Sequence, residues 1–240
     1  MKNMQKILIF LHKIIRALGN RLLDKRIINP RIFSNEMLRK YADFFDGSVI
    51  NVSGWDDRDC ENGFYKDYFK NISSYCVSNV SDEDKGLGTV AESGVKEIEI
   101  DLIKPISEEY KNKFDVVFNH TTLEHVIDVQ TAFKNLCELS RDAVIIVVPV
   151  IQQLHIRSFG DYWRITTLGI AKLFMQNGFT PLVIKTNDQS FAPIYCFAIG
   201  VRNPEKYKDK FEKELDFEMG AALYGSSMKR VYIEKILNKE

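Results

Sequence analysis

The sequence predicts a doubly wound α/β fold built on a mainly parallel sheet, and three observations indicate it. Short apolar runs rich in β-branched residues recur along the chain, with helical patterns between several of them. The run at residues 144–148 (VIIVV) is continuously apolar, as expected for a strand buried on both faces of a parallel sheet. The last two runs are separated by residues 186–190 (TNDQS), which are too few for a helical crossover. We therefore expect that pair to be antiparallel.

These runs predict seven strands. We expect a Rossmann-like, mainly parallel sheet that ends in an antiparallel C-terminal hairpin and is preceded by N-terminal helices. The expected strands lie at residues 48–53, 74–78, 97–101, 114–119, 143–148, 180–185 and 191–201.

Helices are expected before and between these strands. Ser34 and Asp128 precede two of them as N-cap residues, and Gly47 and Gly178 follow two of them where a helix would end. The expected helices after the N-terminal segment lie at residues 34–45, 129–139 and 167–176.

The charge of the chain is unevenly distributed. The 240 residues hold 33 basic and 33 acidic side chains, so the net charge is zero. A general nucleic-acid binder carries a basic excess, and we expect no nucleic-acid partner. Residues 1–40 nevertheless carry ten basic and two acidic side chains, a net +8, and the rest carries −8. We divide the chain into a basic helical extension (1–46), an α/β domain (47–202) and a charged tail (203–240).

The first residues predict an amphipathic helix. The apolar positions follow helical spacing and cations occupy the other face. The apolar run at residues 7–11 is too short for a secretory signal or a membrane span. Two interpretations stay open: a surface helix packed on the domain, or a basic helix lying on an anionic membrane surface. The apolar positions are Ile7, Leu8, Leu11, Ile14, Ile15 and Leu18.

The cysteines and histidines do not have metal-ligand spacing. No two of the four cysteines form a C-x-x-C pair, so we expect reduced, structural thiols and a cytoplasmic protein, with the inner face of the membrane as the alternative location. His120 and His125 are five residues apart and would not share a helix face. We expect no metal. The segment at residues 86–91 (GLGTVA) matches a dinucleotide motif but lacks the preceding strand, so we interpret it as a loop.

Candidate catalytic residues follow the expected strand ends. Ligands bind beyond the carboxyl ends of the strands in such a sheet. His120, His125 and His155 all fall there, and a histidine titrates near neutral pH, which suits a general base. Asp161, Tyr162 and Arg164 follow the fifth expected strand and can bind a phosphate or a sugar. The alternative is that these residues form the start of a helix, with an ion pair between Asp161 and Arg164.

Together these segments resemble the class I S-adenosylmethionine (SAM) dependent methyltransferases. Residues 114–126 (FDVVFNHTTLEHV) are similar to that family's fourth strand and following turn. Residues 161–164 (DYWR), followed by a helix and Gly178-Phe179, are similar to a subgroup associated with bacterial surface-polysaccharide synthesis. The resemblance covers about residues 47–201 and includes the antiparallel last strand.

The resemblance implies a cofactor site, position by position. The glycine-rich loop falls on residues 51–55, the ribose-binding acid near Asn79, and the reaction side on Asn119 and His120. The adenine position falls on Asp101 and Leu102. The family usually has an acid in place of Asn51 and glycines in place of Ser53 and Trp55. The implied cofactor-binding residues are Asn51, Ser53, Gly54, Trp55, Asn79, Asp101, Leu102 and Asn119.

The function implied by the resemblance is methyl transfer from SAM. The expected acceptor is an oxygen on a sugar, a nucleotide-linked precursor or a phosphate-containing precursor of a surface glycan. The departures in the loop motivate the alternative, a methyltransferase fold that has lost catalysis and serves as a binding or scaffold protein.

Overall fold

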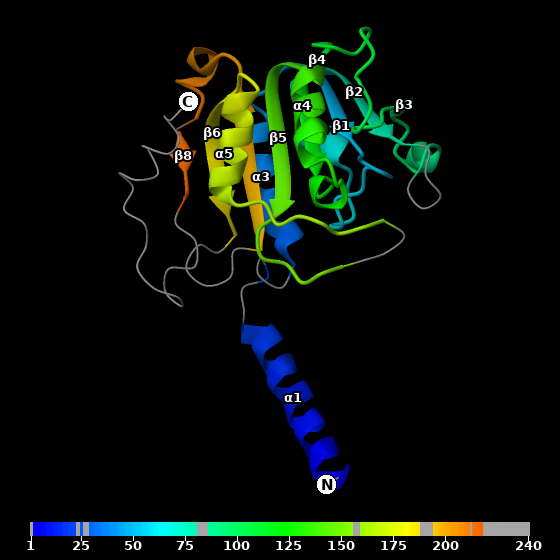
Figure 1. Ribbon diagram of the computed structural model, residues 1–240, viewed down its shortest axis with the longest axis vertical. Coiled ribbons are helices and arrows are strands. Elements are labelled where there is room, and N and C mark those ends of the chain that lie inside the picture. Colours follow the sequence, from blue (N-terminus) through cyan, green and yellow to red (C-terminus); the bar gives the residue numbers. More distant parts are fainter. Residues whose placement is uncertain are drawn as a thin grey trace.

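A computed structural model shows an eight-stranded sheet with helices on both faces (Figure 1). The structure describes residues 2–22, 25, 29–80, 86–155, 159–187, 194–211 and 213–217. The strand order is β3-β2-β1-β4-β5-β7-β6-β8. The strands are β1 (Gly47–Val52), β2 (Ile72–Asn79), β3 (Lys96–Glu99), β4 (Phe114–His120), β5 (Ser140–Pro149), β6 (Thr180–Thr186), β7 (Tyr195–Val201) and β8 (Glu214–Leu215).

The sheet confirms the predicted fold class. Strands β3, β2, β1, β4 and β5 are parallel, and β7 lies antiparallel between β5 and β6. The sequence predicts seven strands, and β8 is an eighth, in the segment expected to be a charged tail. It pairs with β6 through the backbone, where the Asp216 N–H donates to Ile184 O, and Lys185 Nζ lies 3.0 Å from carboxylate oxygens of both Glu214 and Asp216.

Helices cover the two faces of the sheet. The helices α4 (Val129–Leu139) and α5 (Thr167–Gln176) begin and end where the sequence predicts, and their buried rings pack on one face. Figure 1 shows the helix α3 (Pro30–Ala42) on the other face. There α3 and the short 3-10 helices η1 (Tyr65–Tyr68) and η4 (Pro204–Tyr207) bury aromatic rings. Alternate residues of β5 point into the two cores, which explains its continuously apolar sequence.

The helix α3 begins earlier than the sequence predicts. Asn29 is its N-cap, and its side chain accepts a hydrogen bond from the Arg31 N–H. Pro30 stands at the first helical position, where its missing N–H costs nothing. The prediction of Ser34 as the cap is therefore wrong. Ser34 is buried inside the helix, and Tyr41 and Phe45 at its other end enter the core.

The helix α1 (Lys2–Leu22) differs from α3. Figure 1 shows that it extends away from the sheet and its covering helices. Its large apolar side chains are exposed, so the interpretation of α1 as a helix packed on the domain is wrong. No helix among the described residues is long and apolar enough to cross a membrane. The exposed apolar side chains are Met4, Ile7, Leu8, Ile9, Phe10, Leu11, Ile14, Ile15, Leu18 and Leu22.

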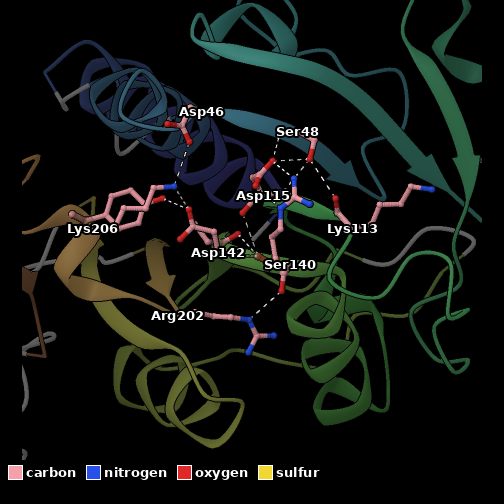
Figure 2. Close-up of polar contacts among 11 residues, drawn as sticks. Asp46, Ser48, Lys113, Asp115, Ser140, Asp142, Arg202 and Lys206 are labelled. Atoms are coloured by element: carbon pink, nitrogen blue, oxygen red, sulfur yellow. Dashed lines mark hydrogen bonds and ion pairs between the residues drawn. The ribbon is translucent and has the colours of Figure 1, made fainter.

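A polar cluster joins the amino ends of β1, β4 and β5 (Figure 2). The Asp115 carboxylate accepts hydrogen bonds from Ser48 N–H (2.6 Å), Ser48 Oγ (2.9 Å) and two nitrogens of Arg141 (2.5 and 2.7 Å). The Arg141 guanidinium, together with these donors, holds the pKa of Asp115 well below its usual range. Gly47 has φ +84°, and a Cβ there would lie 2.1 Å from Asp115 Oδ2. The cluster therefore fixes the amino ends of these strands. The carboxyl ends of β1 and β4, at the other edge of the sheet, lead into the loops of residues 53–56 and 120–122.

We expect Asp115→Asn to lower the free energy of unfolding by about 2 kcal/mol at neutral pH, because charge-assisted hydrogen bonds are lost. The pKa of Asp115 is lowered in the folded state, so its contribution is present above the unfolded value near 3.9 and is lost as the pH falls. Urea unfolding at pH 7 and below pH 4 should show the difference shrinking. The exposed Asp209→Asn is the control, and an equally large loss there would contradict the assignment.

Candidate functional site

A cavity of about 780 Å³ lies beyond the carboxyl ends of the parallel strands. Its walls come from the segments that follow β1, β2, β3, β4 and β5, and from α3 and η1. Ten of the residues predicted from the sequence line it: Asn51, Ser53, Gly54, Trp55, Asn79, Asp101, Leu102, His120, His125 and Tyr162. The cavity therefore gathers most of the predicted cofactor residues in one place.

The loop after β1 adopts a conformation that usually requires glycine. Ser53 and Trp55 have φ values of 55° and 52°, in the left-handed region. Between them, a Cβ on Gly54 would lie 2.5 Å from Asn51 Nδ2. These are the positions where the resemblance expects glycines, so the backbone keeps the glycine geometry with other residues in place.

A buried carboxylate holds this loop. Asp57 has no exposed surface and accepts hydrogen bonds from Asn51 Nδ2 (2.8 Å), Tyr75 OH (2.7 Å) and Lys66 N–H (3.1 Å). Burial raises the pKa of Asp57, and these donors oppose that change. Asn51 is thereby engaged in fixing the turn.

Asn79, the predicted ribose contact, makes hydrogen bonds within the protein. Its Oδ1 accepts from the Trp55 N–H (2.8 Å), and its Nδ2 donates to Trp55 O (3.0 Å) and to Glu97 Oε1 (2.6 Å). The side chain lines the cavity, but its amide is used to clamp the loop backbone. Asn79 therefore positions Trp55.

The predicted adenine and reaction-side residues lie in two different settings. Asp101 lines the cavity, accepts from the Ile103 N–H (3.1 Å), and lies 3.2 Å from Lys104 Nζ. Asn119 is fully buried behind the cavity wall and donates to Val52 O (2.8 Å). Asn119 thus ties β4 to β1 and is not among the lining residues.

His120 lines the cavity but is enclosed by hydroxyl groups. Its Nε2 lies 2.9 Å from Ser34 Oγ of α3, and its Nδ1 lies 3.0 Å from Thr121 Oγ1. Burial lowers the pKa of His120 well below its ordinary value, and the nearby Arg31 adds to this. The ring is therefore neutral at physiological pH.

The other two predicted histidines meet at the rim of the cavity. His125 Nδ1 donates to Gly160 O (2.6 Å), which leaves its Nε2 as the acceptor nitrogen. The ring centroids of His125 and His155 are 5.0 Å apart. His155 is not a lining residue, and its Nδ1 lies 3.1 Å from Asp161 Oδ2.

Two of the three predicted acceptor residues hold a loop together, and the third lines the cavity. Asp161 and Arg164 form a two-pronged ion pair with distances of 2.5 and 2.7 Å, and Asp161 also accepts from the His155 N–H. Arg164 donates to Gln152 O (3.0 Å), so the pair closes the loop after β5 on itself. Tyr162 is the member of the three that lines the cavity.

Two charged residues in this region were missed at the sequence level. Arg31, in the first turn of α3, lines the cavity and donates to Tyr65 OH (2.8 Å). Glu124 is 0% exposed, and neither carboxylate oxygen has a hydrogen-bond partner among the described residues. Burial raises the pKa of Glu124 to about 8. The only signal for either was its position, Arg31 in the basic segment and Glu124 beside His125.

Solved structures share this fold at low sequence identity. A chain of the complex between the Haloferax volcanii Trm112 methyltransferase activator and the putative methyltransferase matches with TM-score 0.55 and 10% identity, covering 78% of this chain and 95% of that chain. The magnesium protoporphyrin IX methyltransferase ChlM of Synechocystis PCC 6803, with bound SAH, matches with TM-score 0.51 and 12% identity, covering 75% and 86%. No family model and no curated protein matches the sequence. The chain therefore has the fold of SAM-dependent methyltransferases.

We expect His120 to stay neutral in the folded protein at pH 6, since burial lowers its pKa. Its folded pKa lies below the unfolded value near 6.5, so it contributes stability above that pH that is lost as the pH falls. Ring-nitrogen NMR between about pH 5 and 8, assigned with His120→Gln, measures this directly. Urea-unfolded protein is the control, and folded protein whose ring titrates near 6.5 would contradict the burial.

Proposed function

We propose that this protein is a SAM-dependent methyltransferase. The observation that carries the proposal is the left-handed backbone at Ser53 and Trp55, at the end of β1 and facing the cavity. Left-handed backbone is usual for glycine, so the loop keeps the turn that the family pattern makes with glycines. The N–H groups of Gly54 and Trp55 donate to Ser78 O and Asn79 Oδ1, which holds this turn in place. The residues present therefore fit the cofactor even though the sequence of the loop departs from the family pattern.

The cavity residues would hold SAM in three places. The backbone of residues 53–55 would meet its methionine part, and Asp101 and Leu102 would meet its adenine. The apolar side chains of Ile103, Ile127 and Phe159 line the same cavity and would exclude water. When bound, SAM supplies a methyl group already activated on a sulfonium, so the protein has mainly to align the reactants.

The acceptor side would lie near Arg31, His120 and His125. Arg31 offers a guanidinium that suits a phosphate or carboxylate on the acceptor. His125 is the better candidate base, because its Nδ1–H is fixed on Gly160 O and Nε2 keeps a lone pair. His120, held between two hydroxyls, would orient the acceptor, and His155 would act through the His125 ring. An oxygen acceptor on a sugar or nucleotide-linked glycan precursor fits these groups.

The alternative is a methyltransferase fold without catalysis that serves as a binding or scaffold protein. The hydrogen bonds of Asn51 and Asn79 favour it, since both amides are spent on the loop itself. The two functions differ in whether the cavity binds SAM.

We expect S-adenosylhomocysteine to bind the wild-type protein in a calorimetric titration. Asp101→Ala should weaken binding by about tenfold or more, because a charged hydrogen-bond partner is removed. Glu99→Ala is the matched control, since Glu99 is exposed two residues earlier and does not line the cavity. A wild-type protein that binds neither SAM nor its product would support the scaffold alternative.

We also propose that α1 holds the protein at the anionic inner face of a membrane. Most of its exposed apolar side chains lie on one side by helical spacing, and Lys6 and Lys13 lie on the other, together with Ile9. Such a helix lies in the interface with its apolar face in the lipid and its cations at the headgroups. The net +8 of residues 1–40 gives the complementary charge.

Leu11→Ser should weaken binding to vesicles of anionic phospholipid by about tenfold, because one apolar side chain leaves the lipid. Ile9→Ser is the matched control, since Ile9 is exposed on the side of Lys13 and should change binding little. Co-sedimentation with neutral and anionic vesicles measures both. Absence of binding to anionic vesicles, or a dimer in light scattering that Leu11→Ser dissociates, would contradict the membrane role.

A further inference from the structure

Three potential metal ligands meet at the rim of the cavity. One ligand atom from each of Glu124, His125 and His155 lies within 4.8 Å of the others. Glu124 and His125 come from the 3-10 helix η3 (Leu123–His125) that follows β4, and His155 comes from the loop after β5. Neighbouring parallel strands end at the same edge of the sheet, which brings residues thirty positions apart together.

A second observation concerns the carboxylate of Glu124. It is 0% exposed, and neither of its oxygens accepts a hydrogen bond from the described residues. Oε1 lies 3.7 Å from His125 Nε2, so the carboxylate faces the imidazole across a gap. A buried carboxylate without a partner is costly, and a cation would satisfy both oxygens.

The histidine contacts are those of metal ligands. A ligating histidine commonly donates its other ring N–H to a carbonyl or a carboxylate, which orients the ring and fixes the tautomer. His125 Nδ1 donates to Gly160 O at 2.6 Å, which leaves a lone pair on Nε2, the ring nitrogen that lies 3.7 Å from Glu124 Oε1. His155 Nδ1 lies 3.1 Å from Asp161 Oδ2, and Asp161 is itself held by Arg164.

We propose that Glu124, His125 and His155 bind a divalent transition-metal ion, for which Zn²⁺ is the probe. Two imidazoles and one carboxylate form a ligand set that zinc takes with one coordination position left open. His125 lines the cavity, so the open position would be reached from there.

The three donor atoms would have to move closer together to bind the ion. Metal–ligand distances near 2.1 Å in a tetrahedron put donors about 3.4 Å apart, which is about 1.4 Å less than the widest separation. His155 is 37% exposed, so its ring has room to turn. From the sequence we expect no metal, because His120 and His125 would not share a helix face. The proposed site instead combines ligands from the 3-10 helix η3 and from the loop after β5.

This site would deepen the proposed function. A metal ion lowers the pKa of a hydroxyl bound to it, so an acceptor oxygen at the open position would lose its proton more easily. The lone pair of His125 Nε2 can bind either the ion or a proton. The ligand role and the base role of His125 therefore exclude each other.

Zinc binding is measured by calorimetry on the full chain after treatment with EDTA, without SAM, so its result is separate from the test of cofactor binding. We expect one ion per chain. Glu124→Gln and His155→Ala should each weaken binding by at least about tenfold, since even residues that only orient ligands often change affinity that much. Circular dichroism establishes that each variant is folded, and His155→Ala alters a partly exposed ring outside the core.

Two controls separate this site from other zinc-binding groups. His12→Ala removes a histidine from α1, and Cys60→Ser removes the exposed thiol, and both should keep wild-type affinity. The proposal is overturned if the wild-type protein binds no zinc, as expected for a Glu124 carboxyl that simply stays protonated. It is equally overturned if folded Glu124→Gln and His155→Ala bind zinc as the wild type does.

Discussion

The shape of the cavity depends on the buried carboxylate of Asp57. Three donors from three segments converge on it: the Asn51 amide at the end of β1, the Tyr75 hydroxyl on β2 and the backbone N–H of Lys66. A buried carboxylate that lost these donors would be strongly unfavourable, so the segment between Asn51 and Lys66 is fixed. The left-handed residues Ser53 and Trp55 lie within it, and their strain is offset by this network.

Asn79 provides the second restraint and explains how the loop keeps its conformation without glycines. Its amide holds both the N–H and the carbonyl of Trp55, so the backbone at that residue has little freedom to relax to a commoner conformation. Side-chain hydrogen bonds thus hold a backbone that glycine would adopt unaided. The departures from the family pattern at Asn51, Ser53, Trp55 and Asn79 are consequently connected, because the amides of Asn51 and Asn79 support the turn in which Ser53 and Trp55 lie.

The basic N-terminal segment serves two different parts of the molecule. In α3, Arg31 enters the cavity and Ser34 bonds to His120, so this helix helps to build the site. In α1, the apolar face is exposed and the helix extends away from the sheet (Figure 1). The net +8 read from residues 1–40 is therefore divided between the cavity and a surface outside it.

The sequence by itself determined the fold class, the seven main strands, α4 and α5, and it named ten residues that line the cavity. The elements follow from periodicity and capping, which depend on neighbouring residues. Seven of the lining residues follow from the resemblance to the methyltransferase family, and the other three from their place after a strand end. Only the tertiary structure decided that Ser34 bonds to His120, that β8 pairs with β6, and that Glu124 and His155 meet. Each of these joins segments far apart in the chain, and such contacts leave no local pattern because they depend on where the strands end in space.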